Sequence, residues 1–275
     1  MSGGELVLTD IVRLYGGGWF GRHAPVRAVD GVSLRLEPGK TLGIVGESGS
    51  GKSTLGRIAA GIEVPTSGRV LLNGKPYAPM GSAAWRRERA SIQVIWQDPS
   101  RALDPRMPIG GQIEEAMAAH RMLDRAGRLA RVGELLELVG LGGLGHRYVH
   151  QLSGGQQQRA VIARALSLAP QIVVCDEAVS ALDVSVQAQI INLLNDLKAR
   201  FAISYLFISH DLGVVRHISD SVAVMREGRI VETGDAQAVF SAPRHPYTKA
   251  LLAAVPAATP AERRAREALS RMETA

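Results

Sequence analysis

Apolar residues along the chain form short β-type runs that alternate with segments of helical spacing. The runs Thr41–Val45, Ile172–Cys175 and Ile203–Ile208 are almost wholly apolar, as in strands that are buried on both faces. Segments such as Val184–Phe201 repeat apolar residues every three or four positions, which predicts helices. This alternation predicts an α/β fold with a largely parallel sheet covered by helices on both faces. Further strands are expected at Leu6–Val12, Val29–Leu36, Gly68–Leu72, Ser91–Trp96, Ser221–Met225 and Arg229–Glu232, and further helices at Leu55–Ala60, Gly154–Ala169 and Tyr247–Ala254.

One segment interrupts the alternation. Between Ile109 and Val139 the apolar residues keep helical spacing with no strand between them. We therefore expect a helical insert, at about residues 100–155, within a domain that covers residues 1–240. Residues 241–275 form a Pro- and Ala-rich tail with a charged end.

Composition narrows the class of protein. The 275 residues are 46% apolar and 21% charged, which is a normal globular balance. No run approaches the roughly 18 apolar residues of a membrane span, and no secretion signal is visible, so a cytoplasmic location is expected. The single cysteine, Cys175, excludes a disulfide framework within the chain and is interpreted as a small buried apolar residue.

The net charge of +6 raises the alternative of a nucleic-acid partner. Arginines cluster at Arg86–Arg89, Arg121–Arg131 and Arg263–Arg266. Such clusters are more often solvated helix faces, so a protein that acts on nucleic acid stays the weaker hypothesis.

A glycine-rich loop follows the run Thr41–Val45. Residues 46–53 match the pattern G-x-x-x-x-G-K-[ST] in full and lie between a predicted strand and a predicted helix. Backbone N–H groups of such a loop close around phosphates, while Lys52 reaches the β- and γ-phosphates and the Ser53 hydroxyl can ligate Mg²⁺. An ordinary turn needs neither the lysine nor this position. The candidate ATP-binding residues here are Gly46, Glu47, Ser48, Gly49, Ser50, Gly51, Lys52, Ser53 and Thr54.

Two carboxylates end the apolar run that begins at Ile172. Ligands of open α/β sheets bind at the carboxyl ends of the strands, so these groups fit a phosphate site. Asp176 would hold Mg²⁺ through water, and Glu177 would polarise the attacking water. Acidic residues after a strand can also be a solvated loop start, and the glycine-rich loop favours the functional interpretation.

A second glycine pair stands at Leu152-Ser153-Gly154-Gly155-Gln156-Gln157. Ser153 and Gln156 have the spacing of a capping box, so a helix start is the simplest interpretation, and the N-terminus of that helix could also bind an anion. These residues match LSGGQ, and the chain resembles the ATP-binding cassette ATPases, in which this motif is the signature. The resemblance implies a P-loop NTPase fold with a RecA-like core, an antiparallel β subdomain and a helical subdomain. It also implies that the signature of one subunit completes the nucleotide site of its partner.

Four more positions are assigned through the resemblance, although each alone is more often structural. It implies that Gln97 senses Mg²⁺ and the attacking water, and that His210 holds the γ-phosphate and Glu177. It also implies that Asp183 lies in a loop that crosses the dimer interface and that Tyr15 stacks on adenine. One departure is visible, because Ala178-Val179 stands where this family usually has Pro-Thr. The carboxylates are intact, so hydrolysis is expected to survive.

The tail narrows the resemblance. Residues 242–256, the insert Gly16–Pro25 and the run Asp98–Arg106 are similar to those of the oligopeptide/dipeptide and nickel importer ATPases, although the tail alone could be an amphipathic helix that serves as a dimer contact. This resemblance implies an ATP- and Mg²⁺-dependent subunit at the cytoplasmic face of the inner membrane that energises peptide uptake, with nickel, opines, glutathione-like compounds or oligosaccharides as alternative cargo. The implied partners are a similar ATPase in a heterodimer, or a second copy, together with two permeases and, indirectly, a solute-binding protein. Some members carry a cysteine cluster beyond the tail, but this chain has none, so no iron–sulfur cluster is expected.

Overall fold

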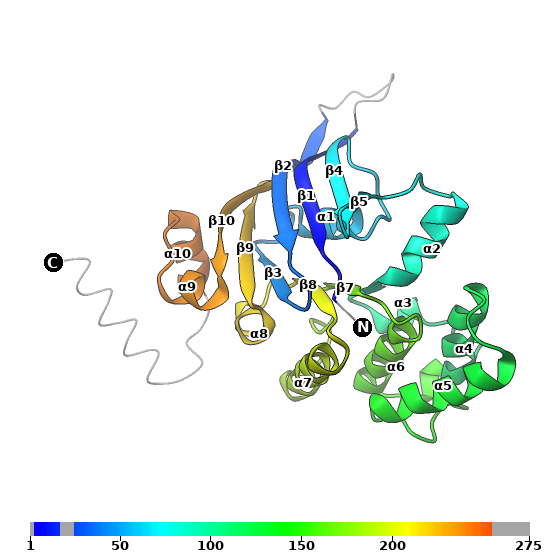
Figure 1. Cartoon of the computed structure of the whole chain (residues 1–275). Helices are drawn as coiled ribbons and strands as arrows, with labels where there is room; N and C mark the ends of the chain where they lie inside the picture. The colour runs from blue at the N-terminus through cyan, green and yellow to red at the C-terminus, as the bar shows by residue number, and fades with distance from the viewer. Residues whose placement is uncertain (1–2, 17–24, 255–275) are drawn as a thin grey trace.

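The computed structural model describes residues 3–16 and 25–254, which form two sheets with helices around them (Figure 1). The larger sheet has the order β10-β9-β3-β8-β7-β6, and the smaller has the order β2-β1-β4-β5. The strands of the larger sheet are β3 (Thr41–Val45), β6 (Ile92–Ile95), β7 (Ile172–Asp176), β8 (Ser204–Ile208), β9 (Ser221–Arg226) and β10 (Arg229–Asp235). Those of the smaller sheet are β1 (Leu6–Tyr15), β2 (Val26–Leu36), β4 (Ser67–Leu72) and β5 (Lys75–Pro76).

The larger sheet is parallel except at one edge. Strands β9, β3, β8, β7 and β6 pair in parallel, while β10 returns antiparallel to β9. Every residue of β3, β7 and β8 is buried, which explains why their sequences are mostly apolar. The predicted α/β class with a largely parallel sheet is confirmed.

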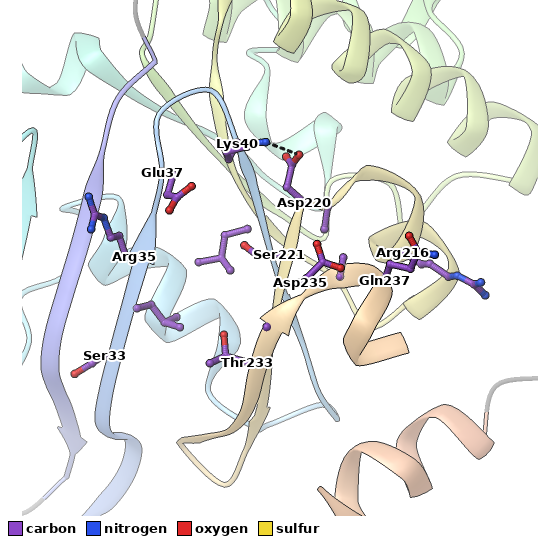
Figure 2. Close-up of a pocket in the computed structure, with 15 residues that line it drawn as sticks. Ser33, Arg35, Glu37, Lys40, Arg216, Asp220, Ser221, Thr233, Asp235 and Gln237 are labelled. Carbon is purple, nitrogen blue, oxygen red and sulfur yellow. Dashed lines mark hydrogen bonds and ion pairs between the residues drawn. The ribbon is translucent and has the colours of Figure 1, made fainter. Parts of the chain in front are cut away.

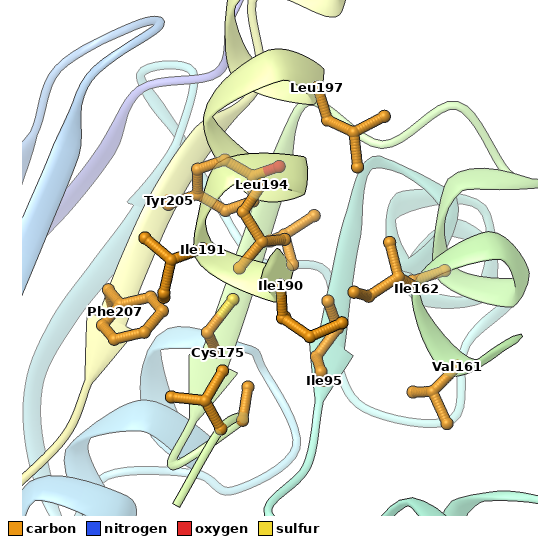
Figure 3. Close-up of a cluster of buried hydrophobic side chains, with 14 of the residues drawn as sticks. Ile95, Val161, Ile162, Cys175, Ile190, Ile191, Leu194, Leu197, Tyr205 and Phe207 are labelled. Carbon is orange, nitrogen blue, oxygen red and sulfur yellow. The ribbon is translucent and has the colours of Figure 1, made fainter. Parts of the chain in front are cut away.

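Helices cover one face of this sheet, and the other face is covered differently from the prediction. Helices α6 (Gly154–Leu166), α7 (Val184–Phe201) and α8 (Leu212–Ile218) pack on the first face, where Ile190, Leu194 and Phe207 meet in one apolar cluster (Figure 3). On the other face, α1 (Lys52–Ala59) lies between the two sheets, and the antiparallel sheet completes the layer. The reason is that β1 and β2 turn apolar side chains such as Leu6 and Leu36 inward, where they pack with Ile44 and Leu55.

Cys175 lies in the first cluster and is fully buried. Burial raises the pKa of its thiol well above the ordinary value, so the group stays a neutral, small core residue as predicted.

The helical insert differs in detail from the prediction. The stretch Ile109–Val139 consists of two helices, α4 (Ile109–Ala119) and α5 (Arg125–Leu138). Arg121 and Leu123 have left-handed backbone angles in the turn between them, and Asp124 caps α5 by accepting a 2.8 Å hydrogen bond from the Gly127 amide. The helical spacing of apolar residues continues on both sides of this short turn, so the apolar pattern alone does not show that the helix is broken there. The insert also contains α3 (Pro99–Ala102) and the short helix η1 (Val149–Gln151).

Four other helices have weak apolar patterns, and three were not predicted. Helix α2 (Ala83–Ser91) has no buried residue and so lacks an apolar stripe, whereas α8 and α9 (Ala236–Ser241) are short. Helix α10 (Pro246–Ala253) forms where the tail helix was predicted. Within residues 3–16 and 25–254, no helix combines the length and apolar character that a bilayer crossing requires.

Candidate functional site

The predicted phosphate-site residues meet at the carboxyl edge of the parallel sheet. The glycine-rich loop follows β3, Asp176 ends β7, His210 follows β8 and Gln97 follows β6. Because these strands run in parallel and in register, their carboxyl ends lie at one edge.

The glycine-rich loop depends on glycine at its two ends. A Cβ atom on Gly46 would lie 2.1 Å from the Met225 carbonyl oxygen, and one on Gly51 would lie 2.1 Å from that of Ala28. Gly51 also has a φ of 104° and precedes α1 without a side-chain cap, so the first amides of α1 have no capping partner of that kind. The close packing fixes the loop, and the uncapped helix start suits an anion.

Lys52 is held inside this loop. Its Nζ atom donates to the carbonyl oxygens of Gly46 at 2.8 Å and Glu47 at 2.7 Å, and the residue is only 5% exposed. Burial lowers the pKa of the amine, and the carboxylates of Glu177 and Asp176 oppose this shift. The loop therefore contains a buried cation that is fixed by backbone carbonyls.

Ser53 and Asp176 lie opposite each other. The Ser53 hydroxyl donates to Asp176 Oδ1 at 2.9 Å. Burial raises the pKa of Asp176; the Ser53 hydrogen bond lowers it, and the negative charge of Glu177 raises it further. The charges of Lys52 and Asp176 thus remain poorly compensated, which is the state that a bound cation and phosphate would relieve.

This electrostatic cost gives a testable consequence. We expect Asp176→Asn to raise the melting temperature of the nucleotide-free protein at pH 7 by a few degrees, at about 2–4 °C per kcal/mol. The raised pKa makes the ionised carboxylate destabilising. The cost is absent below the ordinary pKa, grows as pH rises toward the folded-state pKa and is complete above it. Thermal melts from pH 4 to 8 would measure it.

The control for this variant is Asp196→Asn, because Asp196 is exposed on α7. It is expected to leave the melting temperature unchanged. A lower melting temperature for Asp176→Asn without nucleotide would contradict the assignment of an unfavourable buried charge.

Glu177 and His210 form the second close pair. His210 Nδ1 lies 3.2 Å from Glu177 Oε2, and the His210 side chain is 58% exposed. Glu177 has a φ of 52°, a left-handed value that is uncommon outside glycine, and its amide donates to Ile208 O at 2.9 Å. Ala178 and Val179 are buried beneath the loop, so these two residues anchor it by apolar packing.

Tyr15 lies beside the first turn of α1. Its hydroxyl donates to Glu63 Oε1 at 2.5 Å and lies 3.5 Å from Thr54 Oγ1. The guanidinium of Arg13 lies over the ring, 4.8 Å from its centroid. The structure therefore places Tyr15 next to the glycine-rich loop with one ring face covered by Arg13.

The signature residues form a separate group. Ser153 and Gln156 make the predicted capping box, with bonds of 3.3 Å and 2.9 Å. A Cβ atom on Gly155 would lie 2.6 Å from Val186 Cγ1, near the start of α7, where Asp183 caps the helix at the Val186 amide. In the described residues, no hydrogen bond or ion pair of Ser153, Gly154, Gly155, Gln156 or Asp183 reaches residues 46–54.

Gln97 is the third predicted metal ligand, and the structure does not join it to the other two. It is exposed after β6 and makes no hydrogen bond within the part of the chain that the structure describes. That part also contains no group of three or more His, Cys, Asp or Glu residues arranged to hold a metal. Of the three predicted metal ligands, only Ser53 and Asp176 are therefore joined by a hydrogen bond in the described residues.

A cavity of about 850 Å³ lies elsewhere (Figure 2). Lys40 and Asp220, which pair at 3.4 Å, line it together with Glu37 and Asp235. Lys40 precedes β3, so the cavity is at the amino end of the strand whose carboxyl end bears the glycine-rich loop. It is not the phosphate site.

The arginine clusters are largely engaged in local contacts. Arg128 pairs with Glu114 at 3.3 Å, and Arg131 pairs with Glu134 at 2.8 Å. Arg89 is half-buried and lies over the Trp85 ring, 5.6 Å from its centroid. The cluster at residues 263–266 lies outside the described residues, as do most of the Gly16–Pro25 insert and the end of the tail. These contacts neutralise part of the positive charge that the two described clusters would offer to a nucleic acid.

The sequence interpretation missed one contact of the glycine-rich loop. The Tyr247 hydroxyl, on α10, accepts a hydrogen bond from the Glu47 amide at 3.2 Å. No local pattern signals this contact, since the tail motif alone predicts a helix and not what the helix touches.

Comparisons with known proteins agree with this geometry. The family described as ABC transporter matches residues 29–180, and the family described as oligopeptide/dipeptide transporter, C-terminal region, matches residues 231–274. A putative peptide import ATP-binding protein of Brucella abortus is 54% identical over 240 residues, which cover 86% of this chain and 72% of that protein. A dipeptide transport ATP-binding protein of Haemophilus influenzae is 49% identical over 90% of this chain and 76% of its own length.

Solved structures have the same fold. The ATP-binding cassette MJ0796, in a dimeric post-hydrolysis state bound to ADP and phosphate, superposes with a TM-score of 0.74. Its sequence is 26% identical, and the match covers 84% of this chain and 98% of the other.

Proposed function

Because this chain belongs to the ABC transporter family of ATP-binding proteins, we propose that it is the ATP-hydrolysing subunit of an importer that takes up peptides. The observation that carries the proposal is the carboxyl edge of the sheet, where Lys52, Ser53, Asp176, Glu177 and His210 come together. The match of residues 231–274 to the C-terminal region of oligopeptide and dipeptide transporters supports the peptide class.

In the proposed mechanism the loop amides of residues 49–54 bind the phosphates of ATP, and Lys52 turns its charge to the β- and γ-phosphates. Glu177 accepts the proton of the attacking water, and His210 holds Glu177 in place through their 3.2 Å contact. Tyr15 stacks on the adenine with its free face. Hydrolysis then forms a bond from water oxygen to the γ-phosphorus and breaks the bond to the bridging oxygen, which leaves ADP and phosphate.

Ser53 and Asp176 fit a Mg²⁺ ion, because a hydroxyl and a buried carboxylate meet at 2.9 Å and oxygen ligands suit this ion. Gln97 would complete the set from the end of β6. The ion would neutralise negative charge on the β- and γ-phosphates.

The separation of the two groups of residues supports a dimer. Among the described residues, no hydrogen bond or ion pair joins Ser153, Gly154, Gly155, Gln156 or Asp183 to the loop at residues 46–54, so we propose that they serve the site of a second ATPase. A similar but distinct chain is the proposed partner, and a second copy is the alternative. In the proposed importer this chain lies at the cytoplasmic face of the inner membrane, where it contacts two membrane permeases, and a solute-binding protein takes part indirectly. We assign residues 1–240 to the cassette, about 100–155 to its helical subdomain and 241–275 to the tail.

Reconstitution with the two permeases in vesicles tests this function. Peptide-loaded binding protein is expected to stimulate ATP hydrolysis and peptide uptake, while nickel, an opine or an oligosaccharide is not. If one of those solutes alone stimulates hydrolysis and uptake, that solute is the cargo instead of a peptide, and the assignment of this chain as the ATPase subunit stays. Stimulation by DNA or RNA, with steep salt dependence, would favour the nucleic-acid hypothesis instead.

A further inference from the structure

Helix α10 is fixed to the edge of the larger sheet by polar contacts. The Glu232 carboxylate on β10 accepts hydrogen bonds from the Arg244 amide at 2.8 Å and the His245 amide at 3.0 Å. His245 Nδ1 caps the helix by accepting from the Tyr247 amide at 3.1 Å. Burial raises the pKa of the Glu232 carboxylate, but the Thr248 side chain and the Arg244 and His245 amides lower it by more, so its pKa lies below the ordinary value and the group is ionised at neutral pH.

These contacts place one side chain against the glycine-rich loop. Tyr247 is 7% exposed, and the Arg226 guanidinium lies 5.0 Å from the centroid of its ring. Arg226 ends β9, and the preceding Met225 carbonyl is the atom that leaves no room for a side chain at Gly46. The ring thus lies beside the start of the loop, and its hydroxyl accepts from the Glu47 amide at 3.2 Å, 200 residues away in sequence.

The peptide group that receives this contact also holds the lysine. The Glu47 N–H and the Gly46 carbonyl belong to one planar trans peptide, so they point in opposite directions. The N–H donates to Tyr247, and the carbonyl accepts from Lys52 Nζ at 2.8 Å. Rotation of this peptide would break both contacts together. Fixing its N–H therefore fixes the direction of the carbonyl that orients the Lys52 amine.

We propose that Tyr247 is a positioning residue for Lys52, so that docking of the C-terminal region on the sheet sets the affinity of the loop for ATP. The inference rests on the proposed ATPase function and adds a role for the tail in that site. Docking of α10 and binding of nucleotide must then strengthen each other, since coupling between two sites is reciprocal. The tail then acts on the nucleotide site through the Glu47 amide of the loop.

The test uses the full-length protein with Tyr247→Phe, which keeps the ring and removes only the hydroxyl. Equilibrium titration with a fluorescent ATP analogue is expected to give about fivefold weaker binding, as for one lost hydrogen bond. The melting temperature without nucleotide is expected to stay within about 2 °C of the parent, because the ring still packs. Hydrogen exchange of the segment that contains the Glu47 amide is expected to become faster.

The matched control is Tyr205→Phe. The Tyr205 hydroxyl is buried in the apolar cluster of α7 and has no hydrogen-bond partner within residues 3–16 and 25–254. Its removal is expected to leave ATP binding unchanged. Reciprocity gives a second readout: ATP should slow hydrogen exchange of α10 in the parent, and less so in Tyr247→Phe.

Two results would overturn the inference. One is unchanged ATP affinity in Tyr247→Phe, and the other is weaker binding accompanied by a large fall in the melting temperature without nucleotide, which would mean that the hydroxyl supports the fold alone. Failure of the parent protein to bind ATP would instead contradict the proposed function.

Discussion

Glu177→Gln is expected to lower the turnover number for ATP by about 10²–10⁴-fold while ATP still binds. The amide keeps the size of the side chain but cannot accept a proton from water. Its contact with His210 is a single interaction at 3.2 Å that the amide oxygen can preserve, and the loop stays anchored by buried Ala178 and Val179. Phosphate release measures the loss, and gel filtration with Mg²⁺ and ATP is expected to show a dimer that persists because hydrolysis no longer opens it.

Glu227→Gln is the matched control for this change, because the Glu227 side chain is 81% exposed and, within the described residues, pairs with its neighbour Arg226 alone. It is expected to hydrolyse ATP at the parental rate. Parental turnover by Glu177→Gln would show that another group accepts the proton, and the general-base assignment would be wrong. Loss of ATP binding together with turnover would assign Glu177 to nucleotide binding instead.

The parts of this site that could be predicted are those encoded within one short segment. The geometry of a glycine-rich loop between an apolar strand and a helix is determined by its own residues, because the positive φ angles at Gly49 and Gly51 need glycine. The same is true of Asp176 at the end of a buried strand. Parallel pairing of adjacent strands then brings the loop and the carboxylate together without any further signal.

The parts that were missed depend on tertiary packing. The family resemblance implied the antiparallel sheet, and the structure confirms it, but its place over α1 depends on β1 and β2 turning their apolar residues inward, and alternation alone does not say which layer they cover. Helix α2 has no apolar stripe, since it buries none of its residues. The contact of Tyr247 with Glu47 depends on how Glu232 fixes the start of α10, which no sequence pattern reports.

The residues at the carboxyl edge of the sheet and the signature residues differ in how many site residues the fold of one chain brings together. One chain assembles Lys52, Ser53, Asp176, Glu177 and His210 from three adjacent strands. The signature at Gly154 and Gly155 is equally well built, with a complete capping box, yet its bonds stay local. The proposed dimer would give this helix start a ligand, because a partner's ATP would supply the anion that such a helix start can bind.

Lys52→Met is expected to lower the turnover number by about 10²–10³-fold and to weaken ATP binding as well. The Lys52 amine is a buried cation that two loop carbonyls aim into the phosphate site, and methionine keeps its length without its charge. Because burial lowers the pKa of this amine, its charge does not stabilise the empty protein, and the melting temperature without nucleotide is expected not to fall below that of the parent. The rise in melting temperature that saturating Mg²⁺ and ATP cause should therefore shrink in the variant, since that rise reports affinity for the folded state.

Lys75→Met is the control. Lys75 is exposed on β5, outside the glycine-rich loop, and the substitution removes the same charge as Lys52→Met. It is expected to keep both the turnover number and the ligand-dependent rise in melting temperature. Loss of ligand stabilisation in Lys75→Met would point to a general effect of net charge on ATP binding. Retained turnover in Lys52→Met would mean that loop amides and α1 alone bind and neutralise the phosphates, and that the buried lysine serves only to brace the Gly46 and Glu47 carbonyls.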